Sequence, residues 1–427
     1  MRQTLFVIPR EVAGIEMFGF GWLFGIWLIA SAVLLVWSYR RHGWGVETRG
    51  YLSLLGVVGF AIVFVLPAIS QSDGLPIRGW GVMLLVSIVA ASLLTLYRGA
   101  QRGLDQEMLL SLGTWLFVSG LIGARVFYVI EYWPQYHKAT LGETLAALAN
   151  LTQGGMVVYG SLLAGGAALV IFVRKHHLPG LALSDLVAPA VVLGVGLGRI
   201  GCFVNGCCYG GMTDVPWSVQ FPAGSPAFFD QLHHGDLYIH GLIFVDKTDA
   251  PPVIDKVEPG SPAEKAGLRS GQRVTAIGGV LVTTAEEAQG ELLRTYGAGT
   301  EVSIRVAGES EPKQWAISGP PPRSRPVHPT QLYSLIDALL LCLLVLAYEP
   351  YKRRDGELTA LVLTIHPISR FLLEIIRVDE SAVFNTGLSI SQNISLGIFV
   401  GGILLWVYLL WRRPVGCAWP AHLALAA

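Results

Sequence analysis

The feature that most constrains this chain is a series of long apolar stretches that recurs along most of its length. Nine stretches start near Phe18, Tyr51, Trp80, Met108, Met156, Leu183, Gln331, Leu358 and Ile390. About twenty consecutive apolar residues are needed for a helix to cross the roughly 30 Å hydrocarbon core of a bilayer. Each stretch approaches that length and is bounded by a charged or Pro/Gly-rich turn. The sequence therefore predicts an all-α polytopic membrane protein with about nine transmembrane helices.

The charge content agrees with a membrane protein and argues against one class of partner. Charged residues make up only 14% of the 427 residues, whereas soluble domains contain roughly a quarter. Thirty basic residues balance 30 acidic ones, so nothing favours nucleic acid as a partner. Residues 238–318 hold 19 of the 60 charged groups. We therefore expect one soluble module inside an otherwise apolar chain.

The basic residues of the short loops predict the orientation, because cytoplasmic loops are enriched in Lys and Arg. One set of alternate loops carries 12 basic residues, namely Arg40, Arg41, Arg49, Arg98, Arg102, Arg174, Lys175, Lys352, Arg353, Arg354, Arg412 and Arg413. The opposite set carries 4, namely Arg2, Arg10, Arg78 and Lys138. This bias places the N-terminus and the charged module outside and the C-terminus in the cytoplasm. The first stretch lacks a small-residue cleavage site and is interpreted as a retained anchor.

The charged module contains the string PGSPAEKAGLRSGQRVTAIGG at residues 259–279, which combines tight glycine turns with a short helix at 262–268. With the strands expected on either side, residues 238–318 resemble a small α+β, β-sandwich-like PDZ domain of the bacterial periplasmic kind. Such domains bind extended polypeptide segments at a sheet edge, and HGLIF at 240–244 is the candidate loop for a terminal carboxylate. The alternative is a spacer domain without a ligand. A protease is disfavoured because the module lacks a Ser/His/Asp constellation.

Six ionisable residues lie within the apolar stretches, namely Arg125, Asp185, Arg199, Arg370, Glu374 and Arg377. Each costs about 2.5 to 3.5 kcal/mol on insertion scales, so such residues need partners and usually mark a functional path. A rise of about 1.5 Å per residue places the three arginines at 125, 199 and 370 in the outer half of the bilayer, together with Tyr159, His328 and Gln331.

Structural explanations compete with functional ones for several of these groups. Glu374 is four residues from Arg370 and three from Arg377, so intrahelical ion pairs are available. Asp185 precedes an apolar run where it can cap a helix, and His328 stands at a helix start. Arg125 and Arg199 remain without a sequence partner. Because guanidinium matches phosphate in bidentate geometry, the phosphate of an anionic lipid is the natural counterpart.

Six strings in these stretches resemble the prolipoprotein diacylglyceryl transferase family. They are PIRGWGVMLL (76–85), GLIGARVFYVIEYW (120–133), GGMVVYGSLLAGG (154–166), DLVAPAVVLGVGLGRIGCFVNGCCYG (185–210), HPTQLY (328–333) and RFLLEIIR (370–377). The resemblance covers residues 76–237 and 319–411 as two parts of a transferase-like membrane core. Outside it lie an N-terminal helix pair at 1–75, the PDZ-like insert at 238–318 and a cytoplasmic tail at 412–427.

The resemblance implies a bacterial inner-membrane enzyme that moves diacylglycerol from phosphatidylglycerol onto the lipobox cysteine thiol of secreted prolipoproteins, without a cofactor. Arg199 and Arg370 match the family's arginines and would hold the phosphate, while Asn205 would position the headgroup. Glu374 would orient Arg370, and Arg125 would support the same site. The expected substrate-binding set is completed by Asp185, Gly210, His328, Gln331 and Arg377.

The chain departs from the family pattern at positions that bear on chemistry. Tyr159 stands where the family typically places a histidine that is its usual candidate base, and a phenol is a poor base at neutral pH. His366 lies one helical turn before Arg370 and is the hypothesis for a displaced base, although Pro367 can turn it away.

Cysteines replace the family's usual polar residues at Cys202, Cys207 and Cys208. The three residues can pack as small hydrophobic groups, form a disulfide on an oxidising face, or act as reactive thiols near arginines. No metal is expected, because C-x4-CC lacks the paired spacing of zinc sites and an obvious fourth ligand. These departures leave an alternative function open, that of a diverged relative acting as a lipid- or peptide-binding scaffold or in thiol chemistry.

Overall fold

The computed structural model describes residues 3–43, 45–70, 74–136, 140, 144, 158–246, 251–298, 301–309, 311–317, 319–377, 382–383 and 387–411. The chain divides into two compact units, each considered by itself. One contains residues 1–3, 83–91 and 187–416, and the other contains residues 4–82, 92–186 and 417–427. Met156 and Lys138 lie outside the described residues.

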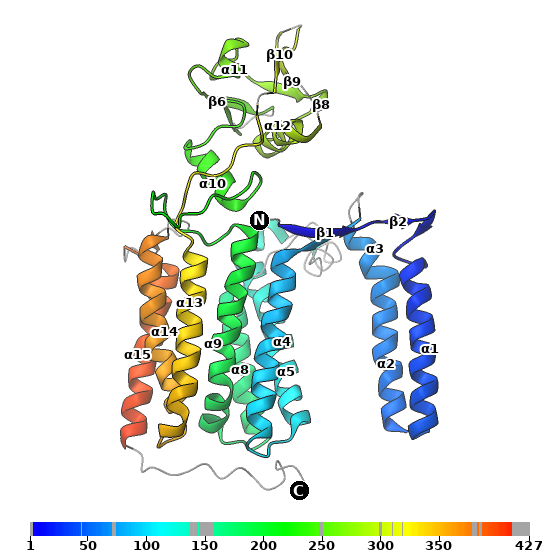
Figure 1. Cartoon of the computed structure of the whole chain (residues 1–427), viewed down its shortest axis with the longest axis vertical. Coiled ribbons are helices and arrows are strands. Elements are labelled where there is room, and N and C mark those ends of the chain that lie inside the picture. Colours follow the sequence, from blue (N-terminus) through cyan, green and yellow to red (C-terminus); the bar gives the residue numbers. More distant parts are fainter. Residues whose placement is uncertain are drawn as a thin grey trace. The chain divides into compact units, whose positions relative to one another are not determined.

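Long helices dominate the fold (Figure 1). They are α1 (Trp22–His42), α2 (Val46–Phe60), the π-helix η1 (Ala61–Val65), α3 (Leu66–Ile69), α4 (Gly79–Ala100), α5 (Gln106–Glu131), α6 (Trp133–Tyr136), α8 (Val158–Lys175), α9 (Gly180–Asn205), α13 (Thr330–Tyr348), the 3-10 helix η2 (Glu349–Tyr351), α14 (Glu357–Ile376) and α15 (Ile390–Trp411). Near the N-terminus, β1 (Thr4–Ile8) pairs with β4 (Leu75–Arg78), and β2 (Glu11–Val12) pairs with β3 (Ile15–Glu16).

Seven of the described helices are long and apolar enough to cross a membrane, which confirms a polytopic membrane protein. They are α1, α4, α5, α9, α13, α14 and α15. The second predicted stretch is divided among α2, η1 and α3, and its apolar part spans only Leu55–Ile69. The fifth forms α8, at Val158–Lys175. The prediction of nine crossings therefore remains a prediction for these two segments.

Helices α5 and α8 pack closely because small residues line their contact. A Cβ atom added to Gly160 would lie 2.1 Å from the Gly123 carbonyl oxygen, and one added to Gly123 would lie 2.4 Å from the Cβ of Ala164. Ser161 Oγ donates a hydrogen bond of 2.9 Å to the Gly120 carbonyl. Close backbone approach through small residues is how helices associate in lipid, where hydrophobic burial adds little.

We expect Gly160→Leu to destabilise the folded protein in detergent by about 2 kcal/mol or more, because the added side chain has no space against α5. Gly165→Leu is the matched control, since a Cβ atom there meets nothing within 4 Å. Thermal unfolding of the two variants measures the difference. Equal unfolding temperatures would contradict the close contact.

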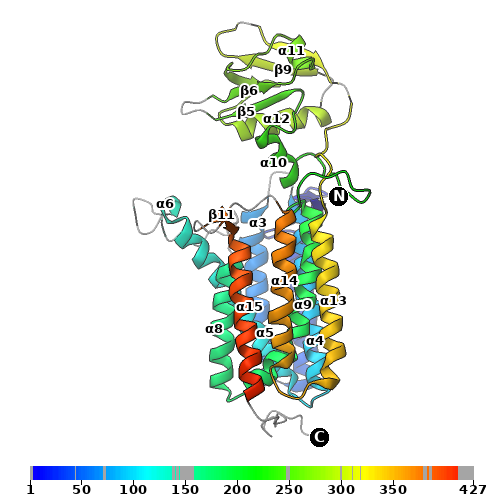
Figure 2. The same ribbon diagram turned by 90° about the vertical axis from the view of Figure 1, so that its left-hand side faces the viewer.

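Helices α13, α14 and α15 run side by side in the other unit (Figures 1 and 2). Pro367 lies inside α14 and has no N–H to donate to the Leu363 carbonyl. On α15, Gly402 leaves room for that carbonyl, because an added Cβ atom would lie 2.7 Å from the Leu363 oxygen. Gly196 of α9 faces Ala338 of α13, with 2.9 Å between an added Cβ and that of Ala338. Helix α14 therefore continues through Pro367. The close approach of Gly196 and Ala338 places α9 next to α13.

The residues between α9 and α13 include a mixed α+β region. Its sheet runs in the order β10-β9-β7-β8, made of Lys313–Ala316, Glu301–Val306, Val274–Ile277 and Val280–Leu281, all antiparallel. A separate pair joins β5 (Leu242–Val245) to β6 (Val253–Val257). Helices α10 (Pro226–His234), α11 (Pro262–Lys265) and α12 (Ala285–Ala298) complete it. Ser225 and Ser261 cap α10 and α11 by accepting backbone hydrogen bonds, and proline follows each of them at the first helical position.

One hydrophobic core joins these elements. It includes Phe228 and Leu232 of α10 together with Ile254, Leu292 and Ile304, all fully buried. The core therefore includes α10, which precedes the predicted boundary at residue 238.

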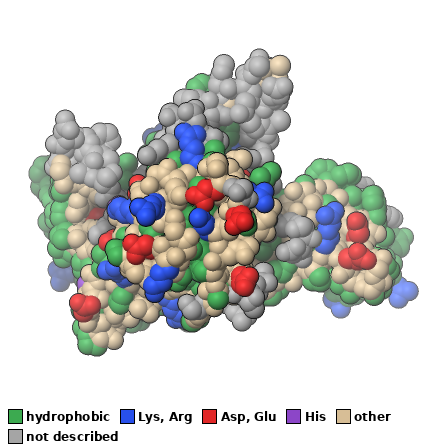
Figure 3. Space-filling view, turned by 90° about the horizontal axis from the view of Figure 1, so that it is seen from above, with side chains coloured by type: hydrophobic (Ala, Val, Ile, Leu, Met, Phe, Trp, Pro, Cys, Tyr) green, Lys and Arg blue, Asp and Glu red, His purple; other side chains and the backbone are tan. Residues whose placement is uncertain are grey.

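Seen from above, described basic and acidic side chains are interspersed over the surface (Figure 3). This mixture agrees with the charge balance of the sequence.

His240 makes the stability of this region depend on pH. Its ring is buried, stacks on Tyr296 with 4.1 Å between centroids, and contacts Thr295 Oγ1 through Nε2 at 3.1 Å. Burial lowers the pKa of His240 from 6.5 to about 4. A depressed histidine pKa gives stability that is complete above the unfolded value near 6.5 and is lost as the pH falls toward 4.

We expect the region to lose about 2 kcal/mol of stability between pH 7 and pH 4 through His240. Hydrogen exchange of the β5 and α12 amides in the full-length protein, corrected for intrinsic rates, measures this loss. His240→Asn is the control, because asparagine tolerates the positive φ of 52° and does not titrate in this range. The same pH dependence in that variant would contradict the assignment.

Candidate functional site

The loop that follows α9 is held between the start of α13 and the end of α14. Gly210 N donates to the His328 carbonyl at 2.9 Å, and Gly211 N donates to the Ile376 carbonyl at 2.8 Å. A Cβ atom on Gly210 would lie 2.7 Å from the Cβ of His328 and 2.9 Å from Cγ2 of Thr330. Only glycine fits this junction without displacing its neighbours. Gly210 therefore shapes the site through its backbone.

Two side chains of α13 fix the same loop. Thr330 Oγ1 donates to the Cys208 carbonyl at 2.7 Å, and Gln331 Nε2 donates to the Cys207 carbonyl at 2.7 Å. Gln331 is only 1% exposed, and its Oε1 is buried without a hydrogen-bond partner among the described residues. An unsatisfied buried acceptor costs about 1 to 3 kcal/mol, so Oε1 is suited to a donor supplied by a ligand.

Arg199 lies in the last two turns of α9 and is only partly exposed. Across the described part of the chain, its guanidinium makes no hydrogen bond or ion pair. A charge within a membrane-spanning helix is expensive unless it is paired or serves a function. Arg199 thus offers a cation whose counterpart is absent from the described protein.

Arg370 and Arg377, in contrast, share the carboxylate of Glu374. Arg370 Nη1 contacts Glu374 Oε2, and Arg377 Nη1 lies 3.3 Å from the same oxygen. Ser389 Oγ donates to Glu374 Oε1 at 3.4 Å, and Arg370 Nη2 donates to Ser391 Oγ at 3.0 Å. The predicted intrahelical ion pairs are therefore present. They hold both guanidinium groups in fixed positions.

His366 lies within α14, one turn before Arg370. Its Nδ1 atom is buried and has no hydrogen-bond partner among the described residues. The charges of Asp337, Arg199 and Arg370 all act on the ring. Asp337 was not predicted as a site residue. Its position as an acidic residue inside the apolar sequence of α13 could have identified it, because a charge in a membrane-spanning helix usually marks a functional site.

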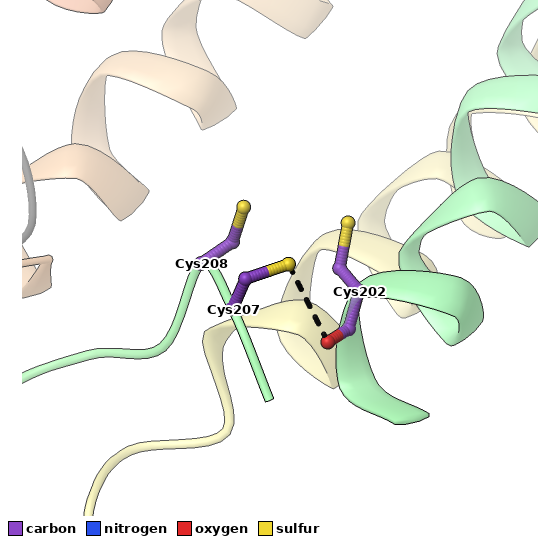
Figure 4. A group of neighbouring side chains, drawn as sticks. All are labelled: Cys202, Cys207 and Cys208. Carbon is purple, nitrogen blue, oxygen red and sulfur yellow. Dashed lines mark hydrogen bonds between the residues drawn. The ribbon is translucent and has the colours of Figure 1, made fainter. Parts of the chain in front are cut away.

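The three cysteines that follow Arg199 converge (Figure 4). Cys202 comes from the last turn of α9 and Cys207 and Cys208 from the loop, and their three Sγ atoms all lie within 4.8 Å of one another. All three are free thiols, and Cys207 Sγ lies 3.7 Å from the Cys202 carbonyl oxygen. Hydrogen bonds from the Cys202 and Cys207 thiols lower the pKa of Cys208, and the charges of Arg377 and Arg199 contribute in the same direction. The Cys208 thiol and burial raise the pKa of Cys207, so Cys208 is the thiol of this loop that is poised to ionise.

Asn205 and His328 contact the loop that carries this cluster, His328 through backbone hydrogen bonds with Gly210 and Gly211. The Asn205 side chain acts on the Cys207 thiol, and the Asn205 backbone carbonyl accepts from Gln3 Nε2 at 3.1 Å. His328 Nδ1 lies 3.3 Å from the hydroxyl of Tyr333, which also accepts from Trp217 Nε1 at 2.6 Å. The structure therefore brings Asn205 and His328 to the loop that carries the cysteines.

The remaining predicted residues belong to the other unit. Arg125 on α5 is 9% exposed, and its guanidinium lies 5.2 Å from the Tyr136 ring centroid and 5.9 Å from that of Tyr128. Asp185 is fully buried, and its backbone carbonyl accepts from Arg98 Nη1 at 3.1 Å. Because α9 begins at Gly180, Asp185 lies inside the helix, and the expected capping position was wrong. Tyr159 is in α8, but its side chain lies outside the described part.

Comparison with known proteins gives consistent matches. The profile of the family described as prolipoprotein diacylglyceryl transferase matches residues 67–408. A Rhodopirellula baltica protein named phosphatidylglycerol–prolipoprotein diacylglyceryl transferase is 34% identical over 450 residues, covering 96% of this chain and 90% of that protein. A Clostridium perfringens protein with the same name and the suffix 2 is 25% identical, and the match covers 78% of this chain and 91% of that protein. A Corynebacterium glutamicum protein with that name is 27% identical, and the match covers 78% of this chain and 80% of that protein.

Proposed function

Because the chain belongs to the prolipoprotein diacylglyceryl transferase family, we propose that it transfers the diacylglyceryl group of phosphatidylglycerol to the lipobox cysteine thiol of a prolipoprotein. It is a transferase and a multi-pass protein of the bacterial inner membrane. In the reaction, the thiol sulfur forms a bond to the glyceryl carbon and the carbon–oxygen bond to phosphate breaks. Glycerol phosphate leaves.

The observation that carries the proposal is the guanidinium of Arg199, which makes no hydrogen bond or ion pair with the described residues. A phosphodiester whose leaving oxygen gains negative charge is stabilised by a cation already in place. Arg199 is the phosphate ligand in this proposal. Arg370, held by Glu374 and Ser391, is the second. Asn205, Gly210, His328, Gln331 and Arg377 shape or line the same part of the protein. Arg125 and Asp185 remain predicted substrate-binding residues.

The direct test is to incubate the purified protein in detergent with phosphatidylglycerol and a lipobox peptide, and to measure the thioether product by mass. Phosphatidylethanolamine replaces phosphatidylglycerol in the control, and a serine peptide replaces the cysteine peptide in a second control. We expect product only with phosphatidylglycerol and the cysteine. Binding of lipid or peptide without product would favour the alternative, a diverged scaffold.

His366 is the proton acceptor in this proposal, since its Nδ1 is buried without a partner among the described residues and the charges of Arg199 and Arg370 act on its ring. Asp337 stabilises the imidazolium that forms. We expect His366→Gln to lower kcat by about a hundredfold or more, which is the usual range for loss of a general base. Asp337→Asn is expected to have a smaller effect and to shift the pH profile of kcat.

His233→Gln serves as the control for that experiment, because His233 is exposed on α10. Transfer at the wild-type rate by His366→Gln would remove His366 from the mechanism. The Tyr159 phenol would then be the remaining candidate base.

The insert at 238–318 is a PDZ-like domain in this proposal, and it binds an extended segment of a precursor or export partner at β5. Two features support this assignment. Strand β5 pairs only with β6 among the described strands, and His240 and Gly241 precede it with positive φ angles of 52° and 82°. Slower amide exchange in β5 of the full-length protein on adding a precursor peptide would support binding. Unchanged exchange at saturating peptide would leave the insert as a spacer.

The basic-loop bias supports an orientation with the N-terminus and the insert outside and the C-terminus in the cytoplasm. Residues 1–75 form an extra N-terminal helix pair in this proposal, 76–237 and 319–411 form the core, and 412–427 form a tail. Labelling of Glu258→Cys and Asp355→Cys with a membrane-impermeant reagent, each in a protein whose five native cysteines are replaced, tests it. We expect labelling in intact cells only at the first position.

A further inference from the structure

The three thiols of Cys202, Cys207 and Cys208 form a cluster that phosphate binding and proton transfer leave unexplained. Ordinary hydrophobic packing does not require three sulfurs within 4.8 Å of one another, all partly exposed and all free. The charge of Arg199, the proposed phosphate ligand, acts on Cys208, and the proposed transfer alkylates a thiol.

The loop holds the sulfurs in place through its backbone. The carbonyl of Cys207 accepts from Gln331 Nε2, that of Cys208 accepts from Thr330 Oγ1, and that of Cys202 accepts from the N–H groups of Gly206 and Cys207. Cys208 has a positive φ of 58°, a backbone conformation that non-glycine residues adopt rarely. Such anchoring keeps the three sulfurs converged.

We propose that Cys202, Cys207 and Cys208 bind one soft metal ion such as Zn²⁺ through three thiolates and leave its fourth position for the thiol of the acceptor polypeptide. Catalytic zinc sites have three protein ligands and an open fourth position, so the absence of a fourth ligand among the described residues is the arrangement expected of such a site. Zinc–sulfur bonds of about 2.3 Å require the sulfurs to move inward by about half an ångström. This inference rests on the proposed transferase function.

Charge and hydrogen bonding around the cluster agree with a metal thiolate. Three thiolates and Zn²⁺ carry one negative charge, and a bound substrate thiolate adds another. The charges of Arg377 and Arg199 act on Cys208 and offset this excess. The Gln331 Oε1 atom, buried and without a partner among the described residues, is an independent sign of a missing ligand, because the same side chain is bonded to the cysteine loop. A water or substrate N–H at the site would satisfy it.

The metal would activate the acceptor thiol as the nucleophile of the transfer. A coordinating thiol is deprotonated, so the incoming cysteine would lose its proton to the solvent or to His366 on binding. Its sulfur then forms the bond to the glyceryl carbon, and the carbon–oxygen bond to phosphate breaks. The electron pair of that bond leaves with glycerol phosphate, which takes up one proton from the medium. The step requires no oxidant or reductant. It would offset the absence of the family's histidine at Tyr159.

The test uses full-length protein in detergent, reduced, stripped with a chelator and reloaded with Zn²⁺ or Co²⁺. We expect one metal ion per chain and, with Co²⁺, thiolate charge-transfer bands and the visible bands of a tetrahedral site. Adding a lipobox peptide should change the visible spectrum, whereas its serine analogue should not. Cys208→Ser and Cys207→Ala should each lose most of the bound metal and at least tenfold of the transfer rate.

Cys342→Ser is the matched control. This thiol is buried in α13, lies 3.3 Å from the Pro189 carbonyl and is distant in sequence from the cluster. The variant should bind metal as wild type does, and thermal unfolding of every variant confirms folding. Metal content is read without reference to transfer, so it separates this inference from the proposed function.

Three results would overturn the metal site. They are absence of stoichiometric metal in the reduced, folded protein, full transfer activity of the stripped protein in chelator, and a disulfide within the cluster of the active protein. A loaded site in a protein that makes no thioether under any condition would instead overturn the transferase function.

Discussion

Arg199→Ala is expected to lower kcat/KM for diacylglyceryl transfer by about a thousandfold or more, the largest effect of any single substitution in the described part of the protein. Loss of one preorganised group that stabilises developing charge costs about a hundred- to a thousandfold. Arg199 adds a full charge in a partly buried position, where its attraction for phosphate is screened less than in water. Initial rates at several phosphatidylglycerol concentrations measure the effect.

Arg199→Lys distinguishes geometry from charge. Lysine keeps the charge but loses the planar pair of donors that matches phosphate, so we expect only partial activity. Arg323→Ala is the control, because Arg323 is exposed between the insert and α13. Because Arg199 has no ion pair with the described residues, its replacement should leave the unfolding temperature almost unchanged. A transfer rate within threefold of wild type for Arg199→Ala would contradict the phosphate role.

Glu374→Gln is expected to have the second largest effect. It should lower both the free energy of unfolding and the rate of diacylglyceryl transfer. Glu374 is 5% exposed, and its carboxylate contacts Arg370, Arg377 and Ser389. Removing the charge of one partner from a buried ion pair typically costs about 3 to 5 kcal/mol, since the other charge stays buried. The two guanidinium groups should then lose their fixed positions. We expect a lower unfolding temperature and at least a hundredfold lower kcat/KM.

Glu357→Gln is the matched control for this experiment. Glu357 is a second buried carboxylate on α14, 3% exposed, near Arg354 at 3.7 Å and at the opposite end of the helix. We expect its substitution to reduce stability by a comparable amount with little change in kcat/KM of the folded fraction. Equal losses of activity in both variants would show that Glu374 acts only through stability.

Two helices, α14 and α9, differ in how far their sequence predicted their structure. For α14, the spacing of Arg370, Glu374 and Arg377 was sufficient, because residues three and four apart share a helix face. For α9, the same reasoning placed Asp185 at a cap, whereas the helix starts earlier, at Gly180. Local spacing predicts contacts inside one element well. Local spacing predicts less well where an element begins, because several neighbouring residues can serve as the cap of the same helix.

Contacts between residues of different helices could not be predicted from local spacing. Asp337 lies in α13 and His366 in α14, and their sequence separation gives no indication that the charge of one acts on the other. Likewise, the buried acceptor of Gln331 and its bond to the cysteine loop follow from how the start of α13 meets the end of α9. The predicted disulfide, packing and thiol alternatives for the cysteines could not be separated without that junction.

Composition and periodicity alone determined that this chain crosses a membrane, contains one charged module and carries arginines among its apolar stretches, because the cost of placing charge and backbone in lipid limits any sequence to a few solutions. The family strings then identified the chemistry. Only the tertiary structure decided that Arg199 has no partner among the described residues and that three sulfurs converge near it. Those facts depend on side chains from separate helices meeting at one loop, and nearest-neighbour sequence patterns do not encode such meetings.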